Sequence, residues 1–299
     1  MRGARLDWII LFTLVAIWGS AFAALKVTVH EIPPAWIAAG RLVIGAALLL
    51  VWARLAGEKL PPFSDKLAWR TYALVGTIGT AAPFFLFAWA SARMDSTLVA
   101  ICNGASPFFT AGLATVMLAE RLDARRIAGI GFGFLGLLTL AAPGLIDAGA
   151  SAQALGVAAG LIGAACYAYA NIVTKAAPPV GPIAASAMFS LAGVAVAVPV
   201  AAATAPVPID ASPAALLALA ALGLGPSGVA SILYVVLIRR RGPMFTAYTT
   251  YLIPIWAAVV GMIFLQERPG LETVVALVLV IVGLALSSWP SQPRRSAAR

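Results

Sequence analysis

The chain of 299 residues is 62% hydrophobic and only 10% charged, with a mean hydropathy of +0.98. A typical soluble domain carries about 25% charged residues, so this composition excludes one or two soluble domains of the same length and indicates a membrane protein. The net charge of +9 does not indicate nucleic-acid binding, because the basic residues form short clusters between long apolar runs.

Uncharged runs alternate with short charged segments along the whole chain. They cover 8–25, 42–53, 71–92, 96–119, 127–146, 148–174, 176–209, 211–238, 242–266 and 273–293. A spanning helix needs about 20 mostly apolar residues, and the short run at 42–53 reaches that length if Arg41 lies inside a helix that begins near Pro34. The alternating segments typical of a membrane β-barrel do not occur. The sequence therefore predicts an all-α polytopic membrane protein with ten transmembrane helices.

The basic residues are unevenly divided between the two sides of this predicted bundle. With a cytoplasmic N-terminus, only Lys26, Arg41, Arg93 and Arg268 of the 20 Lys and Arg residues fall in its outer half. Cytoplasmic segments of membrane proteins carry the excess of positive charge. Both termini are therefore predicted to be cytoplasmic.

Two segments of the chain share a pattern at an offset of 147 residues. Segment 106–122 (SPFFTAGLATVMLAERL) and segment 253–269 (IPIWAAVVGMIFLQERP) each have a proline followed 13 residues later by a Glu-Arg pair. The pattern predicts two five-helix repeats, 1–146 and 147–299, the second ending in a short basic tail. An odd number of helices inverts the second repeat, and inverted repeats are typical of transporters that work by alternating access.

The opening Trp18-Gly19-Ser20, followed by Lys26, resembles the EamA branch of the drug/metabolite transporter superfamily, as do the two proline and Glu-Arg segments. The resemblance covers nearly the whole chain and, within that branch, is to the aromatic amino-acid exporter type. It implies ten helices, an inverted repeat and the movement of small metabolites, usually outward, across a bacterial inner membrane. The second half has Tyr167-Ala168-Tyr169 in place of the Trp-Gly-Ser form, which leaves the role of this position open.

Polar side chains gather in some of the predicted helices and not in others. Because polar groups are costly against lipid, we expect predicted helices one, three, four, six, eight and nine to line a cavity, with five and ten outside. The candidate substrate-binding residues are Trp18, Ser20, Asn103, Ser106, Tyr167, Asn171, Tyr234, Tyr248 and Tyr251. The alternative for each is packing, since hydroxyl and amide groups also join neighbouring helices in membranes.

Prolines interrupt the predicted helices at Pro107, Pro226 and Pro254. A proline removes a backbone donor and leaves carbonyls free for a ligand or for a hinge. The alternative is a static kink. Because glycines cluster around Pro226 within 223–228, we expect a hinge in predicted helix eight.

No acidic residue falls within a long uncharged run, and Arg41 is the one basic residue that a predicted helix could carry to the membrane midplane. This argues against cationic drugs, phosphates and carboxylate-based proton coupling. The sequence favours export of a neutral or zwitterionic metabolite, with an amino acid, aromatic above all, as the expected substrate. The alternatives are another solute class (a sugar phosphate, a nucleoside or a drug) and a membrane-embedded enzyme.

We expect no catalytic residues, no metal site and no cofactor. Cys102 and Cys166 lie in separate apolar segments without C-x₂-C spacing, and the lone His30 falls in a predicted outer loop. The expected partners are a small-molecule substrate and membrane lipid, with no nucleic acid, and the protein is expected to be a monomer or a homodimer.

Overall fold

The computed structural model describes residues 2–62, 64–118, 123–146, 151–175, 181–246 and 248–287, and every regular element within these ranges is helical. In chain order the helices are α1 (Arg2–Val29), α2 (Pro34–Leu55), α3 (Lys66–Gly76), α4 (Ala82–Ser91), α5 (Ser96–Gly104), α6 (Ser106–Leu118), α7 (Ala124–Ile146), α8 (Ser151–Lys175), α9 (Pro182–Thr204), α10 (Pro213–Leu224), α11 (Ala230–Thr246), α12 (Tyr248–Phe264) and α13 (Leu271–Ser287). Two π-helical turns also occur, η1 (Thr77–Ala81) between α3 and α4 and η3 (Gly225–Val229) between α10 and α11.

The helices are long and apolar enough for a membrane. Among the described residues seven helical stretches could span one by length and composition, and the shorter apolar helices Tyr248–Phe264 and Leu271–Leu286 follow them. These findings confirm a polytopic α-helical membrane protein. The residues that follow the predicted repeat boundary at 146, the Glu120-Arg121 pair and the basic C-terminal tail lie outside the described residues.

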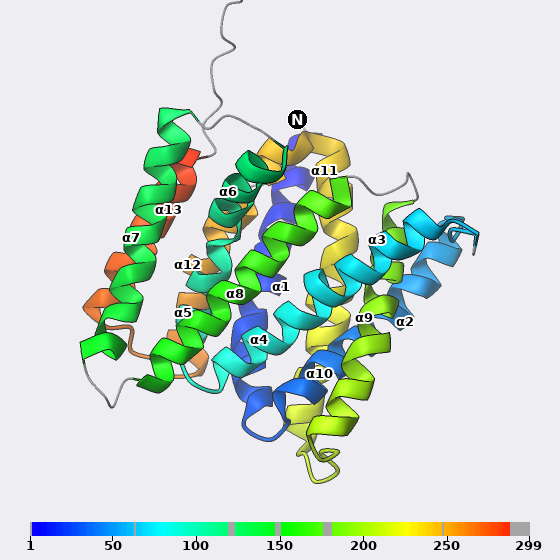
Figure 1. Ribbon diagram of the computed structural model, residues 1–299, viewed down its shortest axis with the longest axis horizontal. Coiled ribbons are helices and arrows are strands. Elements are labelled where there is room, and N and C mark those ends of the chain that lie inside the picture. The colour runs from blue at the N-terminus through cyan, green and yellow to red at the C-terminus, as the bar shows by residue number, and fades with distance from the viewer. Residues whose placement is uncertain are drawn as a thin grey trace, which may run out of the picture.

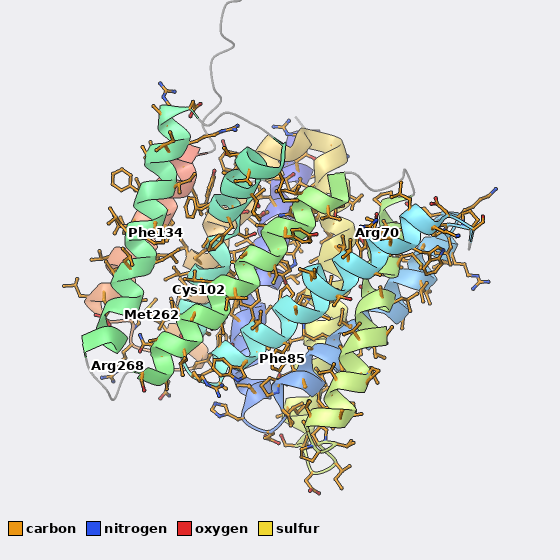
Figure 2. All side chains as sticks on the ribbon, viewed as in Figure 1. Arg70, Phe85, Cys102, Phe134, Met262 and Arg268 are labelled. Atoms are coloured by element: carbon orange, nitrogen blue, oxygen red, sulfur yellow. The ribbon has the colours of Figure 1, made fainter. Side chains whose placement is uncertain are left out.

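The outer surface of the bundle is apolar. Phe134 is 59% exposed on α7, and Figure 2 shows it at mid-height on the outward side, with Arg268 near the lower end of the bundle. α7 and α13, the predicted helices five and ten, lie side by side along one edge (Figure 1). Exposed apolar side chains at mid-height suit contact with lipid tails, and charged residues suit the ends.

α2 and α9 form a second close pair at the opposite edge of the bundle (Figure 1). Small side chains allow this approach, as is common between membrane helices. The buried core between the two helices contains Ala35, Ala39, Leu42, Ala197 and Ala201. α2 also packs on α10 and η3, while α9 packs on α3 and η1.

The crossing of α2 with η3 is equivalent to the crossing of α9 with η1. A Cβ on Gly45 of α2 would lie 2.9 Å from Cβ of Ser227 in η3, and a Cβ on Gly193 of α9 would lie 2.8 Å from Oγ1 of Thr80 in η1. The glycines are 148 residues apart, the hydroxyl residues 147, and η1 and η3 begin 148 residues apart. The two halves of the chain thus build the same helix crossing with matched residues.

Three glutamates cap helices that belong to the other half of the chain. Glu31 accepts hydrogen bonds from the backbone N and Oγ of Ser212 at 2.6 and 2.7 Å, at the start of α10. Glu58 accepts one from the backbone N of Ala184 at 2.7 Å, in the first turn of α9. Glu267 accepts one from the backbone N of Ser96 at 2.7 Å, at the start of α5. Carboxylates at helix N-termini satisfy orphan amides and complement the helix dipole, so these contacts join the halves at the ends of the bundle.

Candidate functional site

Trp18 of α1 contacts the π-helical turn η3. Its Nε1 donates a hydrogen bond to the carbonyl oxygen of Pro226 at 3.2 Å, and its ring centroid lies 5.4 Å from that of Tyr234 on α11. The structure therefore brings together two predicted substrate-binding residues and one predicted hinge residue. A π-helical turn departs from the regular helix bonding pattern and is often found at functional sites.

Arg41 of α2 is the most unusual buried residue near η3. Its side chain is inside the bundle, with the whole residue 8% exposed, and its Nη2 donates to Oγ of Ser227 at 3.5 Å, which is a long bond. Its Cζ lies 3.9 Å from the centroid of the Phe84 ring, so the guanidinium also makes a cation–π contact. No carboxylate of the described residues lies within ion-pair distance of Arg41, and its Nε has no hydrogen-bond partner among them.

The position of Arg41 makes this burial costly. The residue lies seven positions after Pro34, where α2 begins, which at about 1.5 Å per residue is about 10 Å into the helix. An arginine at the centre of a spanning helix costs on the order of 3 kcal/mol on insertion scales. Such residues normally pair with other polar groups or face a cavity, and here the described residues supply an aromatic ring and one long hydrogen bond.

Tyr167 of α8 is a third predicted binding residue, and it packs against α4, the helix that also carries Phe84, the ring in contact with Arg41. Its ring centroid is 5.7 Å from that of Phe87 on α4. Six residues make up what we call the central site: Trp18, Arg41, Phe84, Tyr167, Ser227 and Tyr234. They come from α1, α2, α4, α8, η3 and α11. The central site combines aromatic rings, hydroxyl groups and one cation from both halves of the chain.

Three other predicted binding residues join neighbouring helices. Oγ of Ser20 accepts a hydrogen bond from Nε1 of Trp256 at 3.0 Å, which links α1 to α12. The hydroxyl of Tyr251 donates to the carbonyl oxygen of Leu284 at 3.0 Å, which links α12 to α13. Tyr248 is 48% exposed and packs against Trp8 and other aromatic residues at the start of α12. The structure does not bring these three into the central site.

Asn103 and Ser106 lie on either side of Gly104 and Ala105, where α5 ends and α6 begins, and both are half-buried. Asn171 is exposed near the end of α8. None of these three belongs to the central site as defined, and their role in binding stays a prediction. Pro107 is the second residue of α6, directly after this break in predicted helix four.

Pro254 lies inside α12 and is buried beside the same break, because a Cβ on Gly104 would lie 3.5 Å from its Cγ. The predicted hinges therefore occupy three settings: Pro107 at a helix break, Pro254 within a helix, and Pro226 in a π-helical turn. Whether any of them moves stays a prediction. Neither π-helical turn was predicted: the sequence indicated a hinge at Pro226, which lies in η3, and η1 contains no proline.

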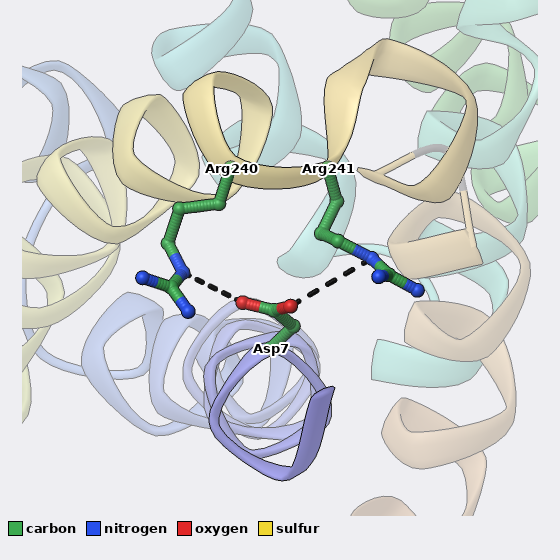
Figure 3. A network of polar contacts seen from close by, with 3 residues as sticks. All are labelled: Asp7, Arg240 and Arg241. Atoms are coloured by element: carbon green, nitrogen blue, oxygen red, sulfur yellow. Dashed lines mark hydrogen bonds and ion pairs between the residues drawn. The ribbon is translucent and has the colours of Figure 1, made fainter. Parts of the chain in front are cut away.

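A cluster of charges joins α1 to α11 at the N-terminal end of α1 (Figure 3). Oδ1 of Asp7 lies 2.6 Å from Nε of Arg240, and Oδ2 of Asp7 lies 3.7 Å from Nε of Arg241. The Asp7 side chain is 6% exposed, whereas those of Arg240 and Arg241 are 38% and 44% exposed. This charge cluster could not be predicted from the sequence, because Asp7 lies more than 230 residues before its two arginine partners.

The opposite end of α1 has a different set of polar contacts. Nζ of Lys26 donates to the carbonyl oxygens of Ser91 and Met94 at 3.1 and 2.9 Å, and so caps the end of α4. Asp95 follows directly, and burial raises the pKa of its carboxyl, with a further increase from the nearby Glu267 and a decrease from Lys26. Lys26 of the Trp-Gly-Ser motif thus holds a helix end in place rather than lying in the central site.

Comparisons with known proteins agree with this architecture. The model of the EamA-like transporter family matches residues 6–142 and again 154–289. The chain is 26% identical over 297 residues to the "Uncharacterized inner membrane transporter YedA" of Escherichia coli K12, covering 95% of this chain and 92% of that protein. It is 26% identical over 298 residues to the "Probable terminal-alkyne amino-acid exporter" of Streptantibioticus cattleyicolor, covering 100% and 98%.

A "Probable amino-acid metabolite efflux pump" of Escherichia coli K12 is 29% identical over 175 residues, which cover 58% of this chain and 54% of that protein. A crystal structure of a protein with 20% sequence identity has the same fold, with a TM-score of 0.66 over 94% of this chain and 96% of that one.

Proposed function

Because the chain belongs to the EamA-like transporter family and is a multi-pass inner-membrane transporter, we propose that it exports small neutral or zwitterionic metabolites, amino acids and aromatic ones above all. The observation that carries this proposal is the central site, in which Trp18 packs against Tyr234 and donates to the carbonyl of Pro226, next to Ser227, the hydrogen-bond partner of Arg41. Aromatic rings offer apolar contact together with a polar edge, which suits an amino acid with an apolar side chain. The two relatives named for amino-acid or metabolite export support the same substrate class.

The proposed mechanism is alternating access between two inverted repeats, 1–146 and 147–299, with ten spans and both termini in the cytoplasm. The equivalent helix crossings at η1 and η3 and the double match to the family model support this arrangement. Transport would rock one half against the other around the central site. The charge cluster at Asp7 would hold the cytoplasmic end closed, and the caps made by Glu31 and Glu267 the outer end.

A second candidate substrate class is an organic anion without an amino group, such as a sugar phosphate. The observation that favours it is the buried Arg41, which has no acidic partner among the described residues. The family and the named relatives are transporters, which favours transport over membrane-embedded catalysis.

The test is flux of labelled phenylalanine, threonine, lysine and glucose 6-phosphate in sealed proteoliposomes that contain the pure protein. We expect saturable flux of phenylalanine and threonine, competed by tryptophan, above that of protein-free liposomes. Flux of glucose 6-phosphate alone would replace the amino-acid proposal with the organic-anion candidate. Size-exclusion chromatography in detergent would test the proposed monomer or homodimer.

A further inference from the structure

Arg41 is a cation placed inside the bundle with part of its hydrogen-bonding capacity unused. A guanidinium has five N–H donors in a planar fork, and the described residues supply one long hydrogen bond to it, from Nη2 to Ser227. The Nε of Arg41 is buried and has no partner among the described residues. An isolated buried charge is expensive, and a negatively charged ligand that completes the ion pair would remove much of that expense.

Helix packing does not explain an arginine at this position. At the equivalent crossing of the second half, Gly193 faces Thr80 just as Gly45 faces Ser227. The two glycines are 148 residues apart, and the same offset maps Arg41 onto Phe189. Phe189 packs against Tyr72, with ring centroids 5.5 Å apart. The same crossing therefore forms with an apolar side chain, and the cation is particular to the first half.

The surroundings of Arg41 suit one end of a small zwitterion. The guanidinium lies over the Phe84 ring, with Cζ 3.9 Å from the ring centroid. Ser227 follows Pro226, the residue whose carbonyl accepts the hydrogen bond from Trp18. Tyr234 lies against Trp18, and Tyr167 packs against Phe87, one turn along α4 from Phe84. A ligand bound to the arginine fork would thus have aromatic rings close by for an apolar side chain.

We propose that Arg41 binds the carboxylate of the transported solute, through its unpaired Nε and a neighbouring Nη in the two-pronged geometry that guanidinium and carboxylate groups share. This inference rests on the proposed export function and narrows it. The substrate class becomes carboxylate-bearing zwitterions, namely α-amino acids, and amines or amides of the same shape are excluded.

The experiment compares phenylalanine with phenylalaninamide, which keeps the ring and the amino group but lacks the carboxylate, in proteoliposomes of the wild-type protein and of Arg41→Lys and Arg41→Gln. We expect the wild-type protein to transport phenylalanine, and the amide to compete with it poorly. In Arg41→Gln the KM for phenylalanine should rise on the order of tenfold to a hundredfold, and the preference over the amide should disappear. Arg41→Lys keeps the positive charge but lacks the planar guanidinium, so its KM for phenylalanine should lie between those of the wild-type protein and Arg41→Gln.

Arg54→Gln is the matched control, because Arg54 lies on the same helix but is exposed near its other end. Its KM and its preference for phenylalanine should equal those of the wild-type protein. Each variant is checked for folded, monodisperse protein by size-exclusion chromatography and thermal unfolding before flux is measured.

The outcomes separate this inference from the proposed function. Wild-type liposomes that move no amino acid would overturn the proposed function. If the wild-type protein moves phenylalanine but Arg41→Gln does so with the same KM and the same preference over the amide, the inference alone is overturned. If neither Arg41 variant folds, equal competition by phenylalanine and phenylalaninamide in the wild-type protein would still overturn it, and strong discrimination would support it.

Discussion

Replacing Asp7 with Asn should loosen the contact between α1 and α11. The substitution keeps the size of the side chain and removes the charge that faces Arg240 at 2.6 Å and Arg241 at 3.7 Å. Removing one partner of a fully buried ion pair costs about 3–5 kcal/mol, and an exposed pair contributes about 0–1 kcal/mol. Because Asp7 is buried while both arginines are partly exposed, we expect a loss of about 1–2 kcal/mol, between these limits.

This loss acts only on the conformer in which α1 and α11 touch, so it shifts the balance between conformers. A change of 1–2 kcal/mol is a factor of about 5–30. A conformer with the two helices apart, populated at about 5% in the wild-type protein, would therefore rise to between about 20% and 60%. On the proposed orientation this conformer is open to the cytoplasm.

Double electron–electron resonance, which measures the distance between two spin labels, detects this shift in conformer populations. Spin labels at Leu6→Cys on α1 and Val236→Cys on α11, in a background without Cys102 and Cys166, report the separation of the two helices. Asp7→Asn should increase the long-distance population, and added salt should weaken the contact in the wild-type protein but change little in the variant.

Asp65→Asn is the matched control, because Asp65 caps its own helix α3 by accepting from the backbone N of Ala68 and does not join the halves. It should leave the distance distribution unchanged. If Asp7→Asn gave the wild-type distribution at every salt concentration, the charge cluster would not hold the helices together and our estimate from its geometry would be refuted.

Three further predictions concern other contacts. Glu267→Gln should lower the free energy of unfolding by about 1 kcal/mol, because the charge that caps α5 is lost, and thermal unfolding checks this; an unchanged midpoint would contradict the cap. Burial raises the pKa of Asp95, so the protein is stabilised while this carboxyl is protonated and loses that contribution as pH rises through its folded-state pKa. Asp95→Asn should therefore gain in melting temperature relative to wild type as pH rises from about 4 to 7, and a constant difference between the two would count against the burial argument. Trp18→Ala and Asn103→Ala should lower phenylalanine flux without loss of folded protein, the first because Trp18 bonds the carbonyl of Pro226; wild-type flux in both would remove them from the binding residues.

The architecture was predictable from the sequence because lipid imposes a simple rule on composition. Uncharged runs of about 20 residues predicted where the helices lie, and α2 begins at Pro34 with Arg41 inside it, as expected. The family resemblance, drawn from Trp18-Gly19-Ser20 and the paired Glu-Arg segments, is confirmed by the family match.

The contacts of individual polar side chains were not predictable in the same way. Periodicity shows which residues share a face of one helix, but it does not show which helix that face meets. Tyr234 and Tyr251 looked alike in the sequence, yet one lies against Trp18 and the other donates to the backbone of α13. The partner of Arg41, Ser227, is 186 residues away, so no local pattern could indicate it.

The offset between the halves also relates features that no local pattern indicates. Applied to the segment around Pro226, it indicates an irregular turn near residue 78, where η1 lies. Applied to Arg41, it shows the asymmetry with Phe189.

The cap that Glu267 places on α5 can form only after most of the chain has been synthesised. Glu267 lies 171 residues after Ser96 and accepts a hydrogen bond from the backbone N of Ser96. At a synthesis rate of about 5–20 residues per second, the Glu267 carboxylate is made about 9–34 s after Ser96. Glu31 has the opposite position, since it is made 181 residues before Ser212, the residue it caps. Glu58 is likewise made before Ala184, the residue whose amide it caps. During synthesis the first half therefore holds one helix end and two carboxylates whose partners have not yet been made, and water at the membrane surface hydrates all three until the second half inserts.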